Sequence, residues 1–286
     1  MTSPTTRQAP PGGRIARLRE AAHRMRGHTL DMGEVQGQGY IGQALGVADI
    51  LAVIYKDQLR FRPDDPHWTE RDRFLLSIGH YAIAVYAALA EAGVIDVAEL
   101  ATYGCDDSRL PMSGMASYTP GMEISGGSLG HGLGVATGMA LGLRHQNNPA
   151  RVYTMLSDGE LDEGSTWEAA MACAHHGLDN VTALVDANAL QADGPTAAVL
   201  KTEPIADKWR AFGWRAERVD GNDISALVDA LDGLRQHRGS PAVLICDTRI
   251  GRGAPLLETR EKAHFMRVEA HEWEIARRQL QEGLTR

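Results

Sequence analysis

The second half of the chain alternates between short apolar runs and longer runs in which apolar residues fall three or four positions apart. The short runs predict strands, at 151–157, 181–187, 214–220 and 241–248. The longer runs predict helices, at 163–177, 203–212, 223–237 and 268–284. Strand–helix alternation of this kind predicts right-handed βαβ units. The predicted fold class is therefore α/β, with an open, mainly parallel sheet and helices on both of its faces.

The first half of the chain is predicted to be mostly helical. Apolar spacing predicts helices at 13–32, 46–57, 80–92 and 96–103. Between the first two, GEVQGQGYIGQALG (33–46) has five glycines in 14 residues. This composition predicts a loop whose backbone turns sharply or closely approaches another group. Residues 1–13, rich in proline and glycine, predict a disordered lead-in, and 14–286 are predicted to form a single domain.

A second glycine-rich segment, SGGSLGHGLGVATGMALGLRHQ (125–146), ends in a helical pattern. Its Gly130, Gly134, Gly138 and Gly142 recur every four residues, which in a helix makes one flat stripe. Glycine inside a helix costs up to about 1 kcal/mol relative to alanine. We therefore expect another backbone to pack closely against this stripe.

Composition argues against several classes of function. The chain has 286 residues, of which 43% are hydrophobic, and a net charge of −8, so a role at nucleic acid or at a membrane surface has no electrostatic support. It shows no signal-peptide pattern and no apolar run of about 20 residues, the length that spans a bilayer. The three cysteines, Cys105, Cys173 and Cys246, are widely spaced, which favours a reduced cytoplasm over a disulfide framework.

The stretch TMLSDGELDEGSTWEAA (154–170) places acidic residues directly after a predicted strand. Asp158 follows that strand, and Asn188 follows the next one, about one βαβ unit later. Ligands of open parallel sheets bind beyond the carboxyl ends of the strands, and neighbouring strands lie about 5 Å apart. We therefore expect the two side chains to share a hard cation, Mg²⁺ or Ca²⁺, which oxygen ligands suit.

A magnesium ion prefers few protein ligands and completes its octahedron with phosphate oxygens and water. Gly159 would let the backbone approach such a phosphate, and the start of the following helix favours an anion. The pattern therefore predicts a metal with a phosphate-bearing ligand. An ordinary acidic first turn of a helix also explains Glu160, Asp162 and Glu163, and that alternative stays open.

Four ordered blocks of the chain resemble transketolases. SDGELDEGSTWEAAMACAHHGLDNVTALVDANALQADGPT (157–196) is similar to the thiamine-diphosphate segment of that family, with its GDG…N signature. Three further blocks resemble the family in the same order: RDRFLLSIGH (71–80), PGMEISGGSLGHGLGVATGMAL (120–141) and DTRIGRG (247–253). The resemblance covers about residues 14–280. Four blocks in order are specific, whereas a lone D-G…N would be weak.

The resemblance implies that a second chain is needed. A transketolase has a diphosphate-binding domain, a pyrimidine-binding domain and a C-terminal domain, and this sequence resembles only the first. The family's glutamate that activates thiamine lies in the second domain, so we expect a partner subunit that carries it, in a heterotetramer with the active site between subunits. Arginines that clamp the sugar phosphate would lie mostly on the partner, and the glycine stripe is a candidate for the contact.

The metal and diphosphate positions carry over one by one from the resemblance. Asp158 and Asn188 match the two side-chain ligands of the metal. The Leu190 carbonyl matches the third protein ligand, and Gly159 matches the backbone donor to the diphosphate. The implied cofactors are thiamine diphosphate and Mg²⁺ or Ca²⁺.

The resemblance also implies residues around the reacting part of the cofactor. Gly127 and Leu129 match the loop that cradles its ring system. His80 and His264 match two histidines near the diphosphate and the reacting carbon, where they bind cofactor and handle protons. Glu163 matches a catalytic glutamate in the proton network that links paired cofactors.

Three positions depart from the family pattern. Ser157 replaces the first glycine of GDG with another small residue. Tyr40 and Ser113 stand where the family has histidines that face the donor sugar, and neither side chain titrates near neutral pH. We therefore expect Tyr40 and Ser113 to contact a donor other than xylulose 5-phosphate. A branched, deoxy or sulfonated ketose would fit, for example one of the apulose-phosphate type.

The implied reaction transfers a two-carbon ketol unit from a ketose phosphate donor to an aldose phosphate acceptor. Two alternatives stay open. The E1α subunit of a 2-oxo-acid dehydrogenase also pairs Asp with Asn around Mg²⁺, although the RDRF block favours transketolase. A non-catalytic regulatory subunit would keep the fold without turnover, although the pair of Asp158 and Asn188 argues against it.

Overall fold

A five-stranded parallel sheet organises the molecule. The computed structural model describes residues 11–260 and 262–284, and its main sheet has the order β2-β3-β4-β8-β7 with every neighbouring pair parallel. The strands are Arg73–Leu76 (β2), Val152–Ser157 (β3), Val181–Ala187 (β4), Arg215–Asp220 (β7) and Ala242–Asp247 (β8). Two small antiparallel ribbons pair Gln38–Gly39 (β1) with Met266–Arg267 (β9), and Leu190–Gln191 (β5) with Gly194–Pro195 (β6).

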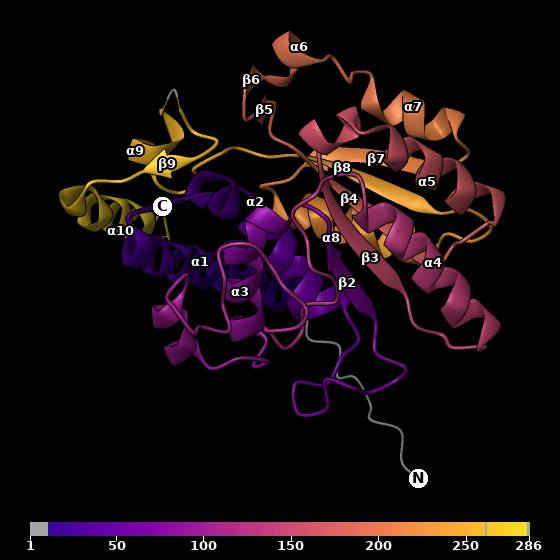
Figure 1. The fold of residues 1–286 in the computed structure, drawn as a ribbon, viewed down its shortest axis with the longest axis horizontal. Helices are drawn as coiled ribbons and strands as arrows, with labels where there is room; N and C mark the ends of the chain where they lie inside the picture. Colours follow the sequence, from indigo (N-terminus) through magenta and orange to yellow (C-terminus); the bar gives the residue numbers. More distant parts are fainter. Residues whose placement is uncertain (1–10, 261, 285–286) are drawn as a thin grey trace.

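Helices cover both faces of this sheet (Figure 1). One face packs against Pro11–Gln36 (α1), Ile41–Val53 (α2), Ala82–Glu91 (α3) and Ile224–Gln236 (α8). The other packs against Gly132–His145 (α4), Gly164–His175 (α5) and Ile205–Ala211 (α7). Because side chains alternate along a strand, Met155 enters the first core and Leu156 the second. The predicted α/β class with two covered faces is confirmed.

A third apolar cluster joins the last helix to the first two. Ala270–Leu284 (α10) lies against α1, and its Trp273 shares a buried cluster with Leu30 and Leu45. Pro255–Glu258 (α9) and β9 contribute Leu257 and Met266 to the same cluster. This packing holds the segment between α9 and β9, which carries His264, beside α2.

Shorter helical segments complete the described part of the chain. They are Ile54–Gln58 (η1), Gly79–Tyr81 (η2), Val97–Thr102 (η3), Gly159–Asp162 (η4) and Thr196–Val199 (α6). The η1 segment continues α2 as a π-helix, and η2, η3 and η4 are 3₁₀ helices. Over the residues that the structure describes, we find no helix with the length and apolar character needed to cross a membrane.

The four strands predicted in the second half of the chain are confirmed, with ends that differ by at most one residue. The strand β2 was not predicted, because its four residues are too few to show a period and charged residues precede them. Of the predicted lead-in, residues 1–10 lie outside the described residues, while 11–13 belong to α1.

The first glycine-rich segment is mostly helical, which corrects the predicted loop. Only residues 37–40 lie between α1 and α2. A Cβ on Gly33 in α1 would lie 2.9 Å from the Trp273 ring, and one on Gly46 in α2 would lie 2.9 Å from the Arg249 carbonyl oxygen. Close packing of helices against their neighbours, rather than an extended loop, therefore explains these glycines.

The expectation that another backbone packs on the glycine stripe is wrong within this chain. Gly130 precedes α4, has a φ of 78° and lies beside Glu163. Gly134, Gly138 and Gly142 lie in α4. Outside the backbone of α4 itself, no atom of the described chain comes within 4 Å of the position that a Cβ would take on them. This side of α4 faces away from the sheet, so the stripe is an open face.

Candidate active site

The end of β3 places Asp158. Ser157 lies opposite Asp186 of β4, and the Asp158 N–H donates to the Asp186 carbonyl at 3.0 Å. The Asp158 side chain is buried, and its carboxylate accepts from the N–H groups of Gly159 at 2.9 Å and Ala189 at 2.7 Å. The two strand ends therefore meet, and the turn after β4 folds back onto Asp158.

A buried network fixes the orientation of Asn188. Its amide nitrogen donates to the Tyr81 hydroxyl at 3.0 Å and to the Asp186 carboxylate at 2.6 Å. The Tyr81 hydroxyl in turn donates to Asp186 at 2.8 Å, and the Thr248 hydroxyl donates to the other oxygen of that carboxylate. The amide oxygen points to the opposite side, where it accepts from the Leu190 N–H at 3.0 Å. A carbonyl oxygen has two lone pairs, so this oxygen retains one for a cation.

The donors in this turn suit a hard divalent cation. Burial, together with the neighbouring Asp186, raises the pKa of Asp158 to about 7, and a cation beside the carboxylate would offset that cost. Among the described residues, no three His, Cys, Asp or Glu side chains gather as a metal site. The candidate donors are instead the Asp158 carboxylate, the Asn188 amide oxygen and the Leu190 carbonyl, a set of oxygens that Mg²⁺ and Ca²⁺ prefer.

We expect the stability of the cation-free protein to fall as the pH rises through the range set by Asp158. The folded state holds a proton on this carboxyl up to a pKa of about 7, against an ordinary value of 3.8. The stabilisation is therefore complete below the ordinary value and is lost as the pH approaches 7. Urea unfolding in a chelator at about pH 5 and about pH 8 should show this loss, and Asp158→Asn should reduce it. An equal loss in both proteins would assign the titration to another group.

Tyr40, His80 and His264 form an aromatic cluster next to the acidic turn. The ring centroids lie 4.5 Å apart for Tyr40 and His80, and 5.7 Å apart for His80 and His264. His80 directly precedes Tyr81, whose hydroxyl contacts Asn188. Burial and the neighbouring His264 lower the pKa of His80 to about 4, and burial lowers the pKa of His264. Both imidazoles are therefore neutral near pH 7, and each has one unprotonated nitrogen.

Gln43 holds His264 in this cluster. The Gln43 side chain is buried, and its amide nitrogen donates to the His264 carbonyl at 2.6 Å and lies 3.2 Å from the His264 Nδ1. Gln43 belongs to the first turn of α2, and Tyr40 immediately precedes that helix. The start of α2 therefore positions two residues of this region, Tyr40 and Gln43.

Glycines let the η2 turn touch the loop around Gly127 backbone to backbone. A Cβ on Gly79 would lie 2.5 Å from the Gly126 carbonyl oxygen. The Ser113 hydroxyl donates to the Gly126 carbonyl at 3.0 Å, and the Gly114 N–H donates to the Gly79 carbonyl at 3.0 Å. The structure thus brings Ser113 and Gly127 together, next to the turn that carries the first histidine.

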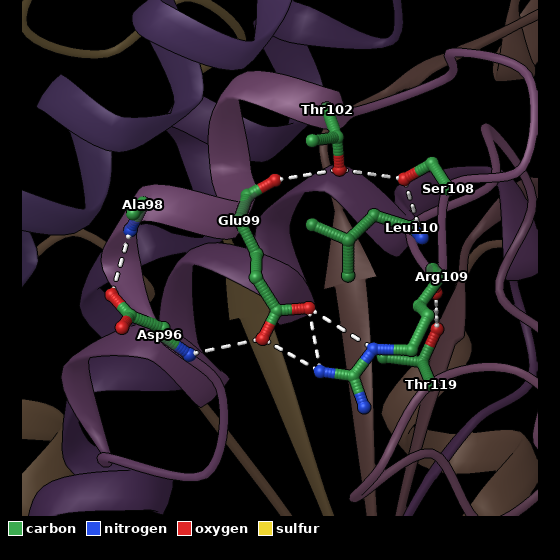
Figure 2. Close-up of polar contacts among 8 residues, drawn as sticks. All are labelled: Asp96, Ala98, Glu99, Thr102, Ser108, Arg109, Leu110 and Thr119. Atoms are coloured by element: carbon green, nitrogen blue, oxygen red, sulfur yellow. Dashed lines mark hydrogen bonds and ion pairs between the residues drawn. The ribbon is translucent and has the colours of Figure 1, made fainter.

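A polar cluster anchors the loop that leads to Ser113, as Figure 2 shows. The Arg109 guanidinium donates to both carboxylate oxygens of Glu99 in η3, each at 2.6 Å from Nη2. The hydroxyls of Thr102 and Ser108 share a hydrogen bond of 2.7 Å. Both contacts tie the beginning of the loop to η3, so they define the point from which the chain turns toward the site.

Glu160 lies in the first turn of η4 and ties the acidic turn to the loops around it. It is fully buried, and its Oε1 accepts from the Ser77 hydroxyl and, at 2.7 Å, from the Gly130 N–H. The Ser77 oxygen also accepts from the Gly132 N–H at 2.9 Å. Burial raises the pKa of Glu160. Its carboxyl therefore joins the ends of β2 and β3 to the start of α4.

The remaining predicted residues border this region. Glu163 is exposed at the N-cap of α5 and makes no capping bond through its side chain. Leu129 is half-buried and lies three residues before α4. Gly159 begins η4, and a Cβ there would lie 3.2 Å from Gln191. The predicted metal ligands therefore lie close to the predicted histidines, whereas Glu163 lies at the surface.

The residues that orient the site were not predicted from the sequence, namely Gln43, Ser77, Tyr81, Asp186 and Thr248. One of them had a local signal, because an ionisable Asp186 in an apolar strand needs partners inside the protein. The others had none. Tyr81 and Asp186, for example, are 105 positions apart in the chain, so only folding shows that they meet.

The fold and the site together define a class of protein. A parallel sheet that presents a carboxylate and an amide at adjacent strand tips, beside two neutral histidines, has the groups that a metal and an anionic cofactor require. Residues 18–284 match the family model described as "Transketolase, thiamine diphosphate binding domain". The chain therefore belongs to the transketolase family and comprises its thiamine-diphosphate-binding domain.

Relatives of this chain bear related names. A transketolase family protein of Sinorhizobium fredii is 62% identical over 94% of this chain and 96% of its own length. A 6-deoxy-6-sulfo-D-fructose transketolase subunit of a Clostridium species is 36% identical over 92% of this chain and 96% of its own. An apulose-4-phosphate transketolase subunit of Actinobacillus succinogenes is 39% identical over 85% of this chain and 88% of its own.

The fold is that of solved transketolases. The transketolase from Campylobacter jejuni superposes with a TM-score of 0.87 and 29% identity over 93% of this chain, which spans 43% of that longer chain. This family assignment argues against the E1α alternative that the Asp–Asn pair left open.

Proposed function

We propose that this chain is the diphosphate-binding subunit of a two-chain transketolase. It would transfer a two-carbon ketol unit from a ketose donor to an aldose acceptor, with thiamine diphosphate and Mg²⁺ as cofactors, in a heterotetramer with a pyrimidine-binding partner. The observation that carries the proposal is the placement of Asp158 and Asn188 side by side, next to His80 and His264, in a member of this family. When bound, thiamine diphosphate supplies the nucleophilic carbon that the protein lacks.

The oxygen donors of the acidic turn would hold the metal and, through it, the diphosphate. Asp158, Asn188 and the Leu190 carbonyl supply these oxygens, and the Asp186 network keeps the amide oxygen of Asn188 turned outward. The Gly159 N–H donates to Asp158 in this structure, so its donation to a diphosphate would require that bond to open.

The two histidines would move protons at the reacting end. Neutral His80 and His264 can each accept a proton, and Gln43 keeps the His264 ring in place. Glu163 lies exposed beside Gly130, where a second subunit can approach it, which suits a role in proton exchange between subunits.

Two observations support a partner chain. The relatives that match along most of their lengths include proteins named as transketolase subunits. The glycine stripe on α4, formed by Gly134, Gly138 and Gly142, is open in this chain, and a stripe of glycines allows another backbone to approach closely. We place the close contact with the partner there.

The donor is expected to differ from xylulose 5-phosphate because the site lacks two imidazoles. Tyr40 contacts both histidines of the cluster, and the Ser113 hydroxyl is already committed to the Gly126 carbonyl. A phenol and a small alcohol offer a hydrogen-bond geometry different from that of an imidazole. Branched or sulfonated ketoses, such as those named for two relatives, are the candidate donors.

An assay of the reconstituted pair tests this proposal. With magnesium and thiamine diphosphate, we expect ketol transfer from apulose 4-phosphate or 6-deoxy-6-sulfofructose at a kcat/KM about 100-fold above that for xylulose 5-phosphate, since mismatched polar groups in a site are strongly discriminated. Efficient turnover of xylulose 5-phosphate would contradict the donor assignment. Oxidation of a 2-oxo acid with an electron acceptor would instead support E1α chemistry, and calorimetry without any cofactor binding would support a non-catalytic subunit.

A further inference from the structure

A basic hollow lies beside the aromatic cluster of the candidate active site. It has a volume of about 680 Å³, and its lining residues are Leu256, Arg260, Lys262, Phe265, Arg267 and Glu272. They come from α9, the segment that follows it, β9 and the start of α10, which lie together at one end of the molecule (Figure 1). None of these residues has a role in the proposed metal and diphosphate site.

Among the described residues, the lining of the hollow has three cationic side chains and one carboxylate, in a chain whose net charge is −8. Arg260 forms an ion pair with Glu272 at 2.5 Å. Among the described residues, the side-chain partner of Arg267 is the neutral Gln38, whose Oε1 accepts from its Nε at 3.2 Å. Within the described ranges, Lys262 has neither an ion pair nor a hydrogen bond through its side chain. Two cations of the hollow are therefore not neutralised by the residues that the structure describes.

The hollow and the candidate active site share a wall. Phe265 is 41% exposed in the hollow, and its ring meets the Tyr40 ring edge-on at a centroid distance of 5.2 Å. The preceding residue, His264, contacts the other side of the cluster through His80. The β1–β9 ribbon pairs Gln38 with Arg267, so the turn that carries Tyr40 and the cationic wall form one unit. The rings of Tyr40 and Phe265 therefore lie between the histidines and the hollow, and a molecule at the histidines would extend past them to reach the cations.

We propose that this hollow binds the anionic end group, a phosphate or a sulfonate, of a sugar substrate. Lys262 would supply a mobile ammonium group, and Arg267 a planar guanidinium that can donate two parallel hydrogen bonds to the oxygens of such a group. Phe265 would cover the carbon side. This inference rests on the proposed function and deepens it, because it assigns part of the selection of anionic sugars to this subunit rather than to its partner.

The test compares a double variant, Lys262→Met with Arg267→Gln, with the wild type in the reconstituted holoenzyme. We expect the KM for the anionic sugar to rise about tenfold with kcat changed less than about twofold, because binding contacts remote from the chemistry act on the ground and transition states alike. A neutral analogue without the end group should show no change. The control is Arg278→Gln, which removes one positive charge from an exposed position of α10 outside the hollow.

Separate arms identify which substrate and which end group the hollow serves. A phosphorylated donor with a neutral acceptor, and a neutral donor with a phosphorylated acceptor, distinguish donor from acceptor. The donor arm is run with a phosphate and with a sulfonate. A rise in KM confined to one arm supports the proposal and names the substrate. Raised salt should weaken the wild-type preference for the anionic sugar in that arm, since exposed charges are screened.

Three results would overturn the proposal. Ketol transfer with an unchanged KM for every anionic sugar removes the hollow from catalysis while the proposed function stands. Loss of assembly with the partner, seen by sedimentation, would make the hollow a subunit contact. If the wild-type pair shows no ketol transfer, the proposed function fails by itself. In that case, calorimetric titration with inorganic phosphate tests the hollow separately. Equal phosphate affinity in the wild type and the double variant would exclude the hollow as a binding site for the anionic end group.

Discussion

Asp158→Asn is expected to abolish ketol transfer and to weaken thiamine-diphosphate binding by at least about 100-fold at millimolar Mg²⁺. The substitution keeps the shape of the side chain, but an amide has a single acceptor oxygen, so only one of the two backbone N–H contacts can persist. It also removes the one ionised ligand of the proposed cation. Without the cation, no positive charge of the metal offsets the negative charge of the diphosphate. Calorimetry with cofactor and Mg²⁺ on the reconstituted pair measures the binding, and the transfer assay measures the activity.

The fold should survive this substitution. Asp158 is buried with a raised pKa, so replacement of its carboxyl by a neutral amide removes an unfavourable buried charge at pH 8. This gain offsets the loss of one of its two backbone hydrogen bonds. Asp229→Asn is the matched control, because Asp229 is exposed on α8, far along the sequence from the acidic turn. Full cofactor affinity in the Asp158 variant would place the metal elsewhere and would remove the basis of the proposed function.

Gly79→Ala is expected to lower the free energy of unfolding by about 3 kcal/mol, near the upper end of what overpacking costs. The new Cβ would lie 2.5 Å from the Gly126 carbonyl oxygen and 2.6 Å from the Gly127 nitrogen. Both are backbone atoms, which cannot rotate away as a side chain can. The η2 turn and the loop around Gly127 would therefore separate, and the His80 ring would shift with them. Urea unfolding and cofactor titration measure the two effects.

The matched control replaces a glycine with free space around it. A Cβ at Gly138 on the open face of α4 meets no atom within 4 Å outside the backbone of its own helix. Gly138→Ala should therefore raise stability by about 0.5–1 kcal/mol, the helix-propensity difference between the residues. If Gly79→Ala were as harmless as Gly138→Ala, the contact between the two loops would not be needed. A failure of the Gly138 variant to assemble with the partner would support the placement of the subunit contact on α4.

Local sequence patterns were sufficient to predict the α/β framework of this protein. The runs at 151–157 and 181–187 are strands β3 and β4, and they are neighbours, as successive βαβ strands tend to be. The position of Asp158 just after a strand followed from the same pattern. The short β2 did not, and the glycines at 33 and 46 were assigned to a loop, because close packing between helices leaves no local trace that separates it from a sharp turn.

The candidate site was predictable where one residue and its chain neighbours define the chemistry. Asp158, Gly159 and Asn188 follow strands, and His80 stands in a block shared with a family. The residues that hold these side chains in position through hydrogen bonds were not predictable. Gln43 reaches His264 across 221 positions, and Thr248 reaches Asp186 across 62, and no pattern within either segment points to the other.

The sequence by itself determined the α/β class, the transketolase family and the acidic turn at the carboxyl end of the sheet. Each of these depends on periodicity or on the order of residues along a short stretch. Only the tertiary structure decided how the Asn188 amide is turned, that Tyr40 and the two histidines share one cluster, and that a cationic hollow adjoins them. The physical reason is that hydrogen bonds, ring contacts and local charge depend on distances in space, and the fold brings together segments that lie far apart in the chain.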